Sequence, residues 1–245
     1  PHPLDRRLFS RRLPFSLATM TNYQTPEELA DAIEEGTRRK YFVGLDLGQT
    51  TDFTAICVVE KQEKPILHLG WRAPAPVSYT TAYRVRHLER MALGTPYTGI
   101  VAYVRTLLNT APLHGADLIV DETGVGRPVV DMFRAAKMNP IPVTITGGDS
   151  WSRSPGGFRV SKLMLVSRLQ AAVHSGLLHI APTEPDGAVL RAELADFQPT
   201  HTPNGYIQYG ARSGRHDDLV LATAIALWHA ATIGNQKMQK ARTRL

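Results

Sequence analysis

The sequence contains one cysteine and no hydrophobic run of membrane-spanning length. Cys57 is the only cysteine in 245 residues, which excludes an internal disulfide framework and a cysteine-rich zinc site. It lies in an apolar stretch, so we expect it to be buried in a core. No apolar run approaches the roughly 20 residues that cross a bilayer. The composition predicts a globular protein that makes no contact with a membrane, and the expected location is cytoplasmic.

Positive charge exceeds negative charge, but unevenly along the chain. The sequence has 28 Lys and Arg against 22 Asp and Glu, and its last ten residues hold four basic residues and no acid. Such a tail suits contact with phosphates, although a solvated chain end is an equal alternative. We expect an N-terminal extension over 1–39, one domain over 40–234 and a basic tail over 235–245. Residues 1–19 precede Met20 and are expected to be a translated upstream segment, with a transit-like leader as the alternative.

Hydrophobic periodicity predicts helices and strands in a definite order. Helices are expected over residues 26–35, 97–108, 128–136, 189–195 and 217–232, with a further helix beginning after Ser161. Strands are expected over 41–47, 53–60, 83–90, 116–120, 141–145 and 177–180, with 66–71 as a weaker candidate and a late hairpin of 197–200 with 206–211. The Gly- and Ser-rich segment 146–159 is expected to be a mobile loop. Antiparallel strands followed by strand–helix crossovers predict an α/β protein with a ribonuclease H-like mixed sheet, flanked by helices on both faces.

Aspartates stand at the ends of three of these elements. Asp46 ends the first strand, Asp121 follows the apolar run ADLIV, and Asp217 with Asp218 opens a strongly apolar helix. Each aspartate alone is explained equally well as a turn or helix cap. Carboxylates gathered at one edge of a sheet raise each other's pKa or require cations. The set therefore predicts two Mg²⁺ or Mn²⁺ ions, bridged by Asp46, and metal-assisted hydrolysis of a phosphodiester.

Other polar residues near these elements are secondary candidates. Asp52, in the turn after the first strand, and His216, before the aspartate pair, are predicted to assist the site. Lys162, Arg153 and Arg159 lie in or just after the Gly-rich segment and are predicted to contact DNA phosphates, with solvated surface positions as the alternative. In the last helix, Trp228 and His229 are expected to be packing residues.

Four segments resemble the nuclease domain of phage terminase large subunits. They are GLDLGQTTD, LIVDETGVGRPVVD, VSKLMLVSRLQAAVHSGLLHIA and GRHDDLVLATAIALWHA, within roughly residues 40–232. The resemblance implies a Mg²⁺- or Mn²⁺-dependent endonuclease that cuts concatemeric viral DNA during packaging by a two-metal-ion mechanism. The family's catalytic and metal-binding acids map onto Asp46, Asp121 and the pair Asp217–Asp218.

The resemblance also implies partners and a departure from the family. The partners are double-stranded DNA, a separate packaging ATPase, a small terminase and a portal, in the host cell cytoplasm. Full-length members carry an N-terminal packaging ATPase, whereas this sequence has no G-x-x-x-x-G-K-[ST] phosphate loop. We therefore expect either an excised nuclease domain or a stand-alone nuclease.

Three other interpretations of the sequence's function remain open. GLDLGQTTD also resembles the first phosphate-binding segment of the actin, Hsp70 and sugar-kinase group, although those proteins need two such lobes. A Holliday-junction resolvase shares the expected fold. A non-catalytic DNA-binding module would keep the same acids as turn caps. Nucleotide affinity, preference for four-way junctions and absence of metal binding would identify these alternatives in turn.

Overall fold

The computed structural model describes residues 25–48, 52–67, 78–124, 127–196, 198–201, 207–210 and 216–242. Two compact units are distinguished: one takes in the chain up to Thr37 together with Lys64–Thr80, and the other Arg38–Glu63 together with the chain from Thr81 onward. In the smaller unit, helix α1 (Pro26–Gly36) begins with the predicted cap. The Thr25 hydroxyl accepts a hydrogen bond from the Glu28 amide, and the Glu28 carboxylate accepts one from the Thr25 amide.

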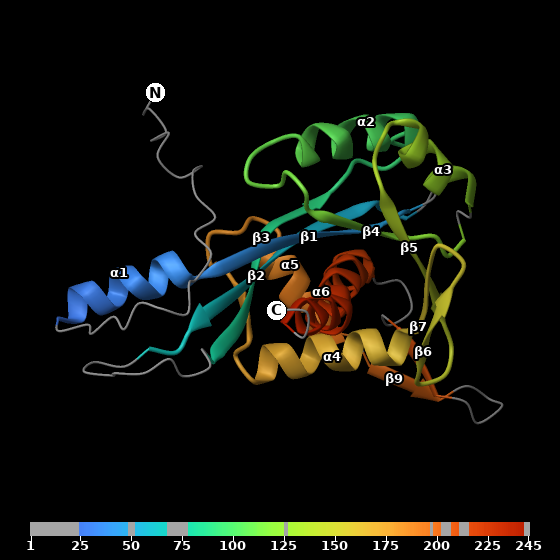
Figure 1. Cartoon of the computed structure of the whole chain (residues 1–245). Coiled ribbons are helices and arrows are strands. Elements are labelled where there is room, and N and C mark those ends of the chain that lie inside the picture. The colour runs from blue at the N-terminus through green and yellow to red at the C-terminus, as the bar shows by residue number, and fades with distance from the viewer. Residues whose placement is uncertain are drawn as a thin grey trace. The chain divides into compact units, whose positions relative to one another are not determined.

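A mixed eight-stranded sheet organises the larger unit (Figure 1). Its spatial order is β6-β7-β5-β4-β1-β2-β3-β8. The strands are β1 (Arg38–Asp46), β2 (Ala55–Pro65), β3 (Tyr79–Arg90), β4 (Asp117–Asp121), β5 (Pro140–Thr146), β6 (Trp151–Ser154), β7 (Gly157–Ser161) and β8 (Leu178–Ile180). The first strand pairs antiparallel with β2 and parallel with β4, as the hairpin and the later crossover predict. The mixed α/β sheet of the ribonuclease H-like class is confirmed.

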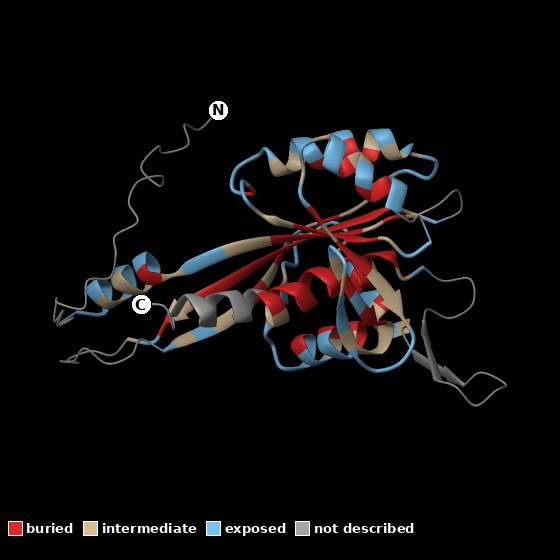
Figure 2. Ribbon diagram, turned by 45° about the vertical axis from the view of Figure 1, so that its right-hand side comes forward, coloured by how far each residue is buried: buried red, intermediate tan, exposed pale blue. Residues whose placement is uncertain are grey.

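Helices cover both faces of this sheet (Figures 1 and 2). On one face lie α2 (Tyr97–Leu108) and α3 (Arg127–Ala135), and on the other α4 (Lys162–His174), α5 (Gly187–Asp196) and α6 (Asp218–Arg242). Alternation along β1 separates two apolar cores, since Val43 packs toward α2 and α3 while Phe42 packs toward α4, α5 and α6. Ser161 caps α4 as predicted, its hydroxyl accepting a hydrogen bond from the Met164 amide.

Helix α6 is the most deeply buried helix of the larger unit. Its residues from Asp218 to Ala230 are all buried, including Trp228 and His229, which confirms their predicted packing role. The helix lies so close to β1 that a Cβ atom added at Gly44 would stand 2.0 Å from the Ala222 carbonyl oxygen. The predicted end of the helix at residue 232 is wrong, because the helix continues to Arg242.

The predicted mobile loop over 146–159 is also wrong. Residues Trp151–Ser154 and Gly157–Ser161 form the antiparallel pair β6–β7, and β7 pairs with β5. The glycines serve this geometry: Gly156 turns the chain at φ +83°, and a Cβ on Gly157 would meet the Pro142 carbonyl at 2.1 Å. The segment is a hairpin whose glycines allow close approach.

The remaining elements follow the expectation with shifted ends. The late hairpin forms as β9 (Gln198–His201) and β10 (Ile207–Gly210). Of the weaker strand candidate, Ile66 and Leu67 belong to no strand and residues 68–71 lie outside the described residues, as do 49–51 of the turn after β1. No helix in the described ranges is long and apolar enough to cross a membrane.

Candidate active site

An acidic cleft of about 390 Å³ opens where β1 ends and α6 begins. Its lining residues are Asp46, Leu47, Gly48, Asp52, Thr123, His216, Asp217 and Asp218. The chain order explains the convergence, because β1 and β4 are parallel neighbours and end at the same edge of the sheet, where the loop after β4 supplies Thr123. Asp46, Asp52, Asp217 and Asp218 thus face a single cavity, from segments about 170 residues apart in the sequence, whereas the predicted Asp121 is not among its lining residues.

Asp46 is the carboxylate whose pKa is raised by three neighbouring aspartates. It is the last residue of β1 and is half-buried. Burial raises the pKa of Asp46 well above its ordinary value, and the carboxylates of Asp121, Asp218 and Asp217 raise it further. The ammonium group of Lys162 opposes them. The cleft therefore holds more negative charge than its own cations balance.

Asp121 ends β4 and is buried, with 5% of its surface exposed. Burial raises its pKa to about 6, against the lowering effects of hydrogen bonds from Thr123 and the charge of Lys162. The Thr123 amide donates to Asp121 Oδ1 at 2.8 Å. The Thr123 hydroxyl in turn accepts from the Ile145 amide at 2.7 Å. These two bonds tie the loop after β4 to β5 and hold the carboxylate in place.

Asp217, directly before α6, and Asp218, its first residue, differ in their surroundings. Lys162 Nζ donates to Asp217 Oδ2 at 2.7 Å, so the predicted phosphate-contact lysine is held by an acid in this structure. Asp218 is buried, and its Oδ2 accepts no hydrogen bond from the residues that the structure describes. Arg90 Nη2 at 3.6 Å and His216 Nδ1 at 3.7 Å are the basic groups nearest to it. Burial raises the pKa of Asp218, whereas Arg90 and His216 lower it.

Two residues of the site escaped the sequence-based prediction. Arg90, the last residue of β3, forms an ion pair with Glu193 of α5 and faces Asp218. The second Glu193 oxygen accepts the Val220 amide in the first turn of α6 at 3.1 Å. Burial raises the pKa of Glu193 to about 7, while Arg90 lowers it. One feature of the sequence could have indicated Glu193: it lies three residues after Leu190, on the face of α5 that is buried and otherwise apolar.

The auxiliary and DNA-contact candidates lie in different places. Asp52 and His216 line the cleft, and the His216 ring meets the Phe53 ring edge-on at 5.2 Å. Arg153 stands over the Phe158 ring, 5.5 Å from its centroid. Arg159 lines a separate cavity. The two arginines are thus not among the residues that line the acidic cleft.

The donor atoms of the cleft suit a hard divalent cation. Carboxylate oxygens are the ligands that Mg²⁺ and Mn²⁺ prefer. The raised pKa of Asp46 and the unbonded buried oxygen of Asp218 both mark negative charge that a cation would balance. Within the described ranges, however, no three acidic, histidine or cysteine side chains stand close enough to hold an ion. The carboxylate ligands therefore fit a hard divalent cation, and binding would require these side chains to turn toward the ion.

No family model and no curated protein matches this sequence. Among solved structures, the chain is similar to the large terminase nuclease from thermophilic phage G20c, with 19% identity over 87% of each chain and a TM-score of 0.54. The structure of the same nuclease with bound magnesium is 20% identical over 85% of each chain, with a TM-score of 0.54. The large terminase nuclease domain of Thermus phage P74-26 is 19% identical over 78% of this chain and 80% of its own, with a TM-score of 0.54. At these identities the likeness establishes a shared fold.

Proposed function

We propose that this chain is a divalent-metal-dependent DNA endonuclease of the phage terminase large subunit type. The observation that carries the proposal is the acidic cleft, where Asp46, Asp217 and Asp218 face one cavity and Asp121 acts electrostatically on Asp46. The fold it shares with terminase nucleases supports this reading, since one of those nucleases binds magnesium and cobalt. The rest of the chain supplies the scaffold, with residues 40–234 as the proposed nuclease domain.

In the proposed mechanism the aspartates hold the cation and their neighbours fix the aspartates. Two divalent ions at this position would divide the chemistry, one supplying an activated water and the other stabilising the leaving 3′ oxygen. Asp46 and Asp121 would be ligands, with the Thr123 amide keeping Asp121 oriented. Asp217, directly before α6, and Asp218, the first residue of α6, would complete the set. Lys162 offsets the charge of Asp217 while no cation is bound.

The biological setting follows from the proposed family. Concatemeric viral double-stranded DNA would be the substrate, cut during packaging in the host cytoplasm. A separate packaging ATPase, a small terminase and a portal would be the partners. No zinc finger is possible with one cysteine and no base-reading motif is evident, so cleavage should have low sequence specificity.

Cleavage of supercoiled plasmid by the purified full chain tests the proposal. With Mn²⁺ or Mg²⁺ we expect nicked and linear products, and with EDTA none. Asp46→Asn and Asp121→Asn should each reduce cleavage by at least about 10²-fold, because each removes a charged ligand of the cation. Asp31→Asn, an exposed acid on α1, is the matched control and should cut normally.

The same preparation separates the alternatives. A folded protein that cuts nothing under any metal would contradict the nuclease reading, and ATP affinity would then favour the kinase-like reading. Preferred cleavage of four-way junctions over linear duplex would favour a resolvase. DNA binding without metal binding or cleavage would leave a non-catalytic DNA-binding module.

A further inference from the structure

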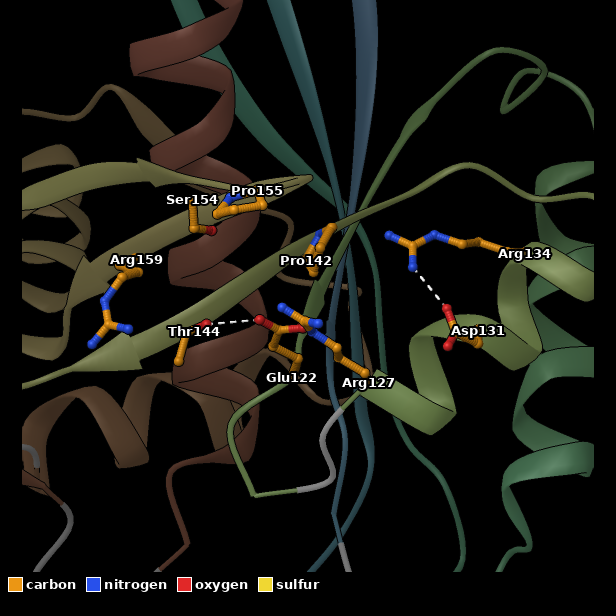
Figure 3. A pocket seen from close by; sticks show the side chains of 9 residues that line it. All are labelled: Glu122, Arg127, Asp131, Arg134, Pro142, Thr144, Ser154, Pro155 and Arg159. Atoms are coloured by element: carbon orange, nitrogen blue, oxygen red, sulfur yellow. Dashed lines mark hydrogen bonds and ion pairs between the residues drawn. The ribbon is translucent and has the colours of Figure 1, made fainter.

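A second cavity, of about 490 Å³, opens where Glu122 follows the end of β4 (Figure 3). Three arginines line it: Arg127 and Arg134 from α3, and Arg159 from β7. Two acids, Glu122 and Asp131, line it as well. We call this cavity the arginine pocket. It is framed by the end of β4, α3, β5 and the β6–β7 turn, so all its walls belong to the larger unit (Figure 3).

Both acids of the arginine pocket already have partners. Asp131 Oδ1 accepts from Arg134 Nη1 at 2.8 Å, and Glu122 Oε1 accepts from the Thr144 hydroxyl at 2.7 Å (Figure 3). The guanidinium groups of Arg127 and Arg159 form no hydrogen bond or ion pair with any residue that the structure describes. Two cations are therefore available to a ligand, and the pocket carries a net positive charge.

The loop after β4 separates the arginine pocket from the acidic cleft. Glu122 lines the pocket, and the next residue, Thr123, lines the cleft. Both are fixed to β5, because Thr144 donates to Glu122 and the Ile145 amide donates to Thr123. The two cavities thus share a wall that is anchored by hydrogen bonds. One side of this wall is strongly acidic and the other is basic.

We propose that the arginine pocket binds a backbone phosphate of the DNA substrate other than the phosphate that is cleaved. This inference rests on the proposed function only for the identity of the substrate. A DNA strand is repelled by the acidic cleft until cations occupy it, so an attractive contact must come from elsewhere on the same surface. Guanidinium groups match phosphate oxygens in geometry as well as in charge. Arg127 and Arg159 hold the strand beside the cleft, and the fixed shared wall sets the spacing between the two phosphates.

Binding in EDTA, where no cleavage occurs, tests the pocket. Association of a short fluorescent duplex with the full chain would be measured by anisotropy over a series of salt concentrations. The double variant Arg127→Gln/Arg159→Gln should bind several-fold more weakly, and the slope of log K against log salt should become shallower by about 1, the value for one lost phosphate contact. The matched control is Arg105→Gln/Arg191→Gln, which removes two exposed arginines of α2 and α5. It should change neither quantity by a comparable amount.

The outcomes distinguish failure of the arginine-pocket proposal from failure of the nuclease proposal. An unchanged slope in a folded double variant, an equal change in the control pair, or no DNA binding by the unaltered chain in EDTA would each overturn the pocket proposal. If the unaltered chain cuts no plasmid but the pocket variant alone loses the salt-dependent contact, the pocket stands and the nuclease proposal fails. Where cleavage occurs, the pocket variant should raise KM more than it lowers kcat, since it removes a contact made before the reaction.

Discussion

At the scale of single residues, a buried carboxylate such as Asp121 opposes folding when it is ionised. Its pKa of about 6 lies above the ordinary value of 3.8, chiefly because of burial. The folded protein therefore binds more protons than the unfolded chain between these values, and stability falls as the pH rises from about 4 to about 6. Above pH 6 the ionised group lowers the free energy of unfolding by about 3 kcal/mol.

Replacing this charge should therefore stabilise the metal-free protein. Asp121→Asn keeps an oxygen for the Thr123 amide and removes the charge. We expect the variant's melting temperature to exceed that of the unaltered chain at pH 7.5, with a smaller difference at pH 5, where Asp121 is mostly protonated. Thermal unfolding in EDTA at the two pH values measures this. A variant that melts lower at pH 7.5, or gains equally at both, would contradict the assigned pKa.

The ion pair of Arg90 with Glu193 should matter more than a surface pair. Arg90→Gln leaves the mostly buried Glu193 carboxylate without its cation and removes the positive group nearest Asp218. We expect the free energy of unfolding to fall by about 3 kcal/mol, measured in urea at pH 7.5. The comparison variant is Arg134→Gln, which breaks an exposed pair with Asp131 and should change stability by less than about 1 kcal/mol.

Metal affinity measures whether Arg90 also influences the candidate metal site, apart from its effect on stability. Because Arg90 lowers the pKa of Asp218, Arg90→Gln should leave Asp218 protonated to a higher pH and weaken Mn²⁺ binding through that protonation, and Arg90→Lys should recover part of the affinity. If Arg90→Gln binds Mn²⁺ as tightly as the unaltered chain, Arg90 serves the fold alone.

At the scale of secondary structure elements, the site depends on how closely α6 approaches β1. Gly44 has no side chain, and this allows the Ala222 carbonyl of α6 to approach the strand backbone. The approach brings Asp218, at the start of α6, to the same cleft as Asp46, at the end of β1. The packing of one helix on one strand thus sets the distance between two acids that are far apart in the sequence.

Filling this contact should disturb both stability and the site. A Cβ at Gly44 would stand 2.0 Å from the Ala222 oxygen, so Gly44→Ala must displace α6. We expect a loss of about 3 kcal/mol or more in the free energy of unfolding by urea. Gly147→Ala is the control, because nothing lies within 4 Å of its Cβ, and it should be neutral within about 0.5 kcal/mol. Equal stability of both variants would contradict the close approach.

The elements show where sequence reasoning succeeds and where it stops. Asp46 and Asp121 could be placed at one edge because short apolar runs identify β1 and β4, and parallel neighbours end together. The β6–β7 hairpin was missed because Gly156 and Gly157 look like loop residues until the close contact with Pro142 is known. The pairing of Arg90 with Glu193 joins residues 103 positions apart, and no local pattern indicates it.

At the scale of the whole chain, only the larger unit holds the candidate site. Every lining residue of the acidic cleft and of the arginine pocket lies within it. The two cavities place opposite charge on either side of one loop, which suits a polyanionic strand that must approach a metal site. Cations bound to the folded state alone would also stabilise it, so the acids that oppose folding in the metal-free protein favour it when metal is present.

Titration of the full chain with Mn²⁺ by calorimetry tests the central claim most directly, namely that the acidic cleft is a divalent-cation site. We predict saturable binding of one or two ions at pH 7.5, weaker at pH 5 because protons compete for the carboxylates whose pKa values are raised. Asp46→Asn and Asp218→Asn should lose this binding, and Asp31→Asn should retain it. No binding by the folded chain, or equal binding by all of these variants, would contradict the account.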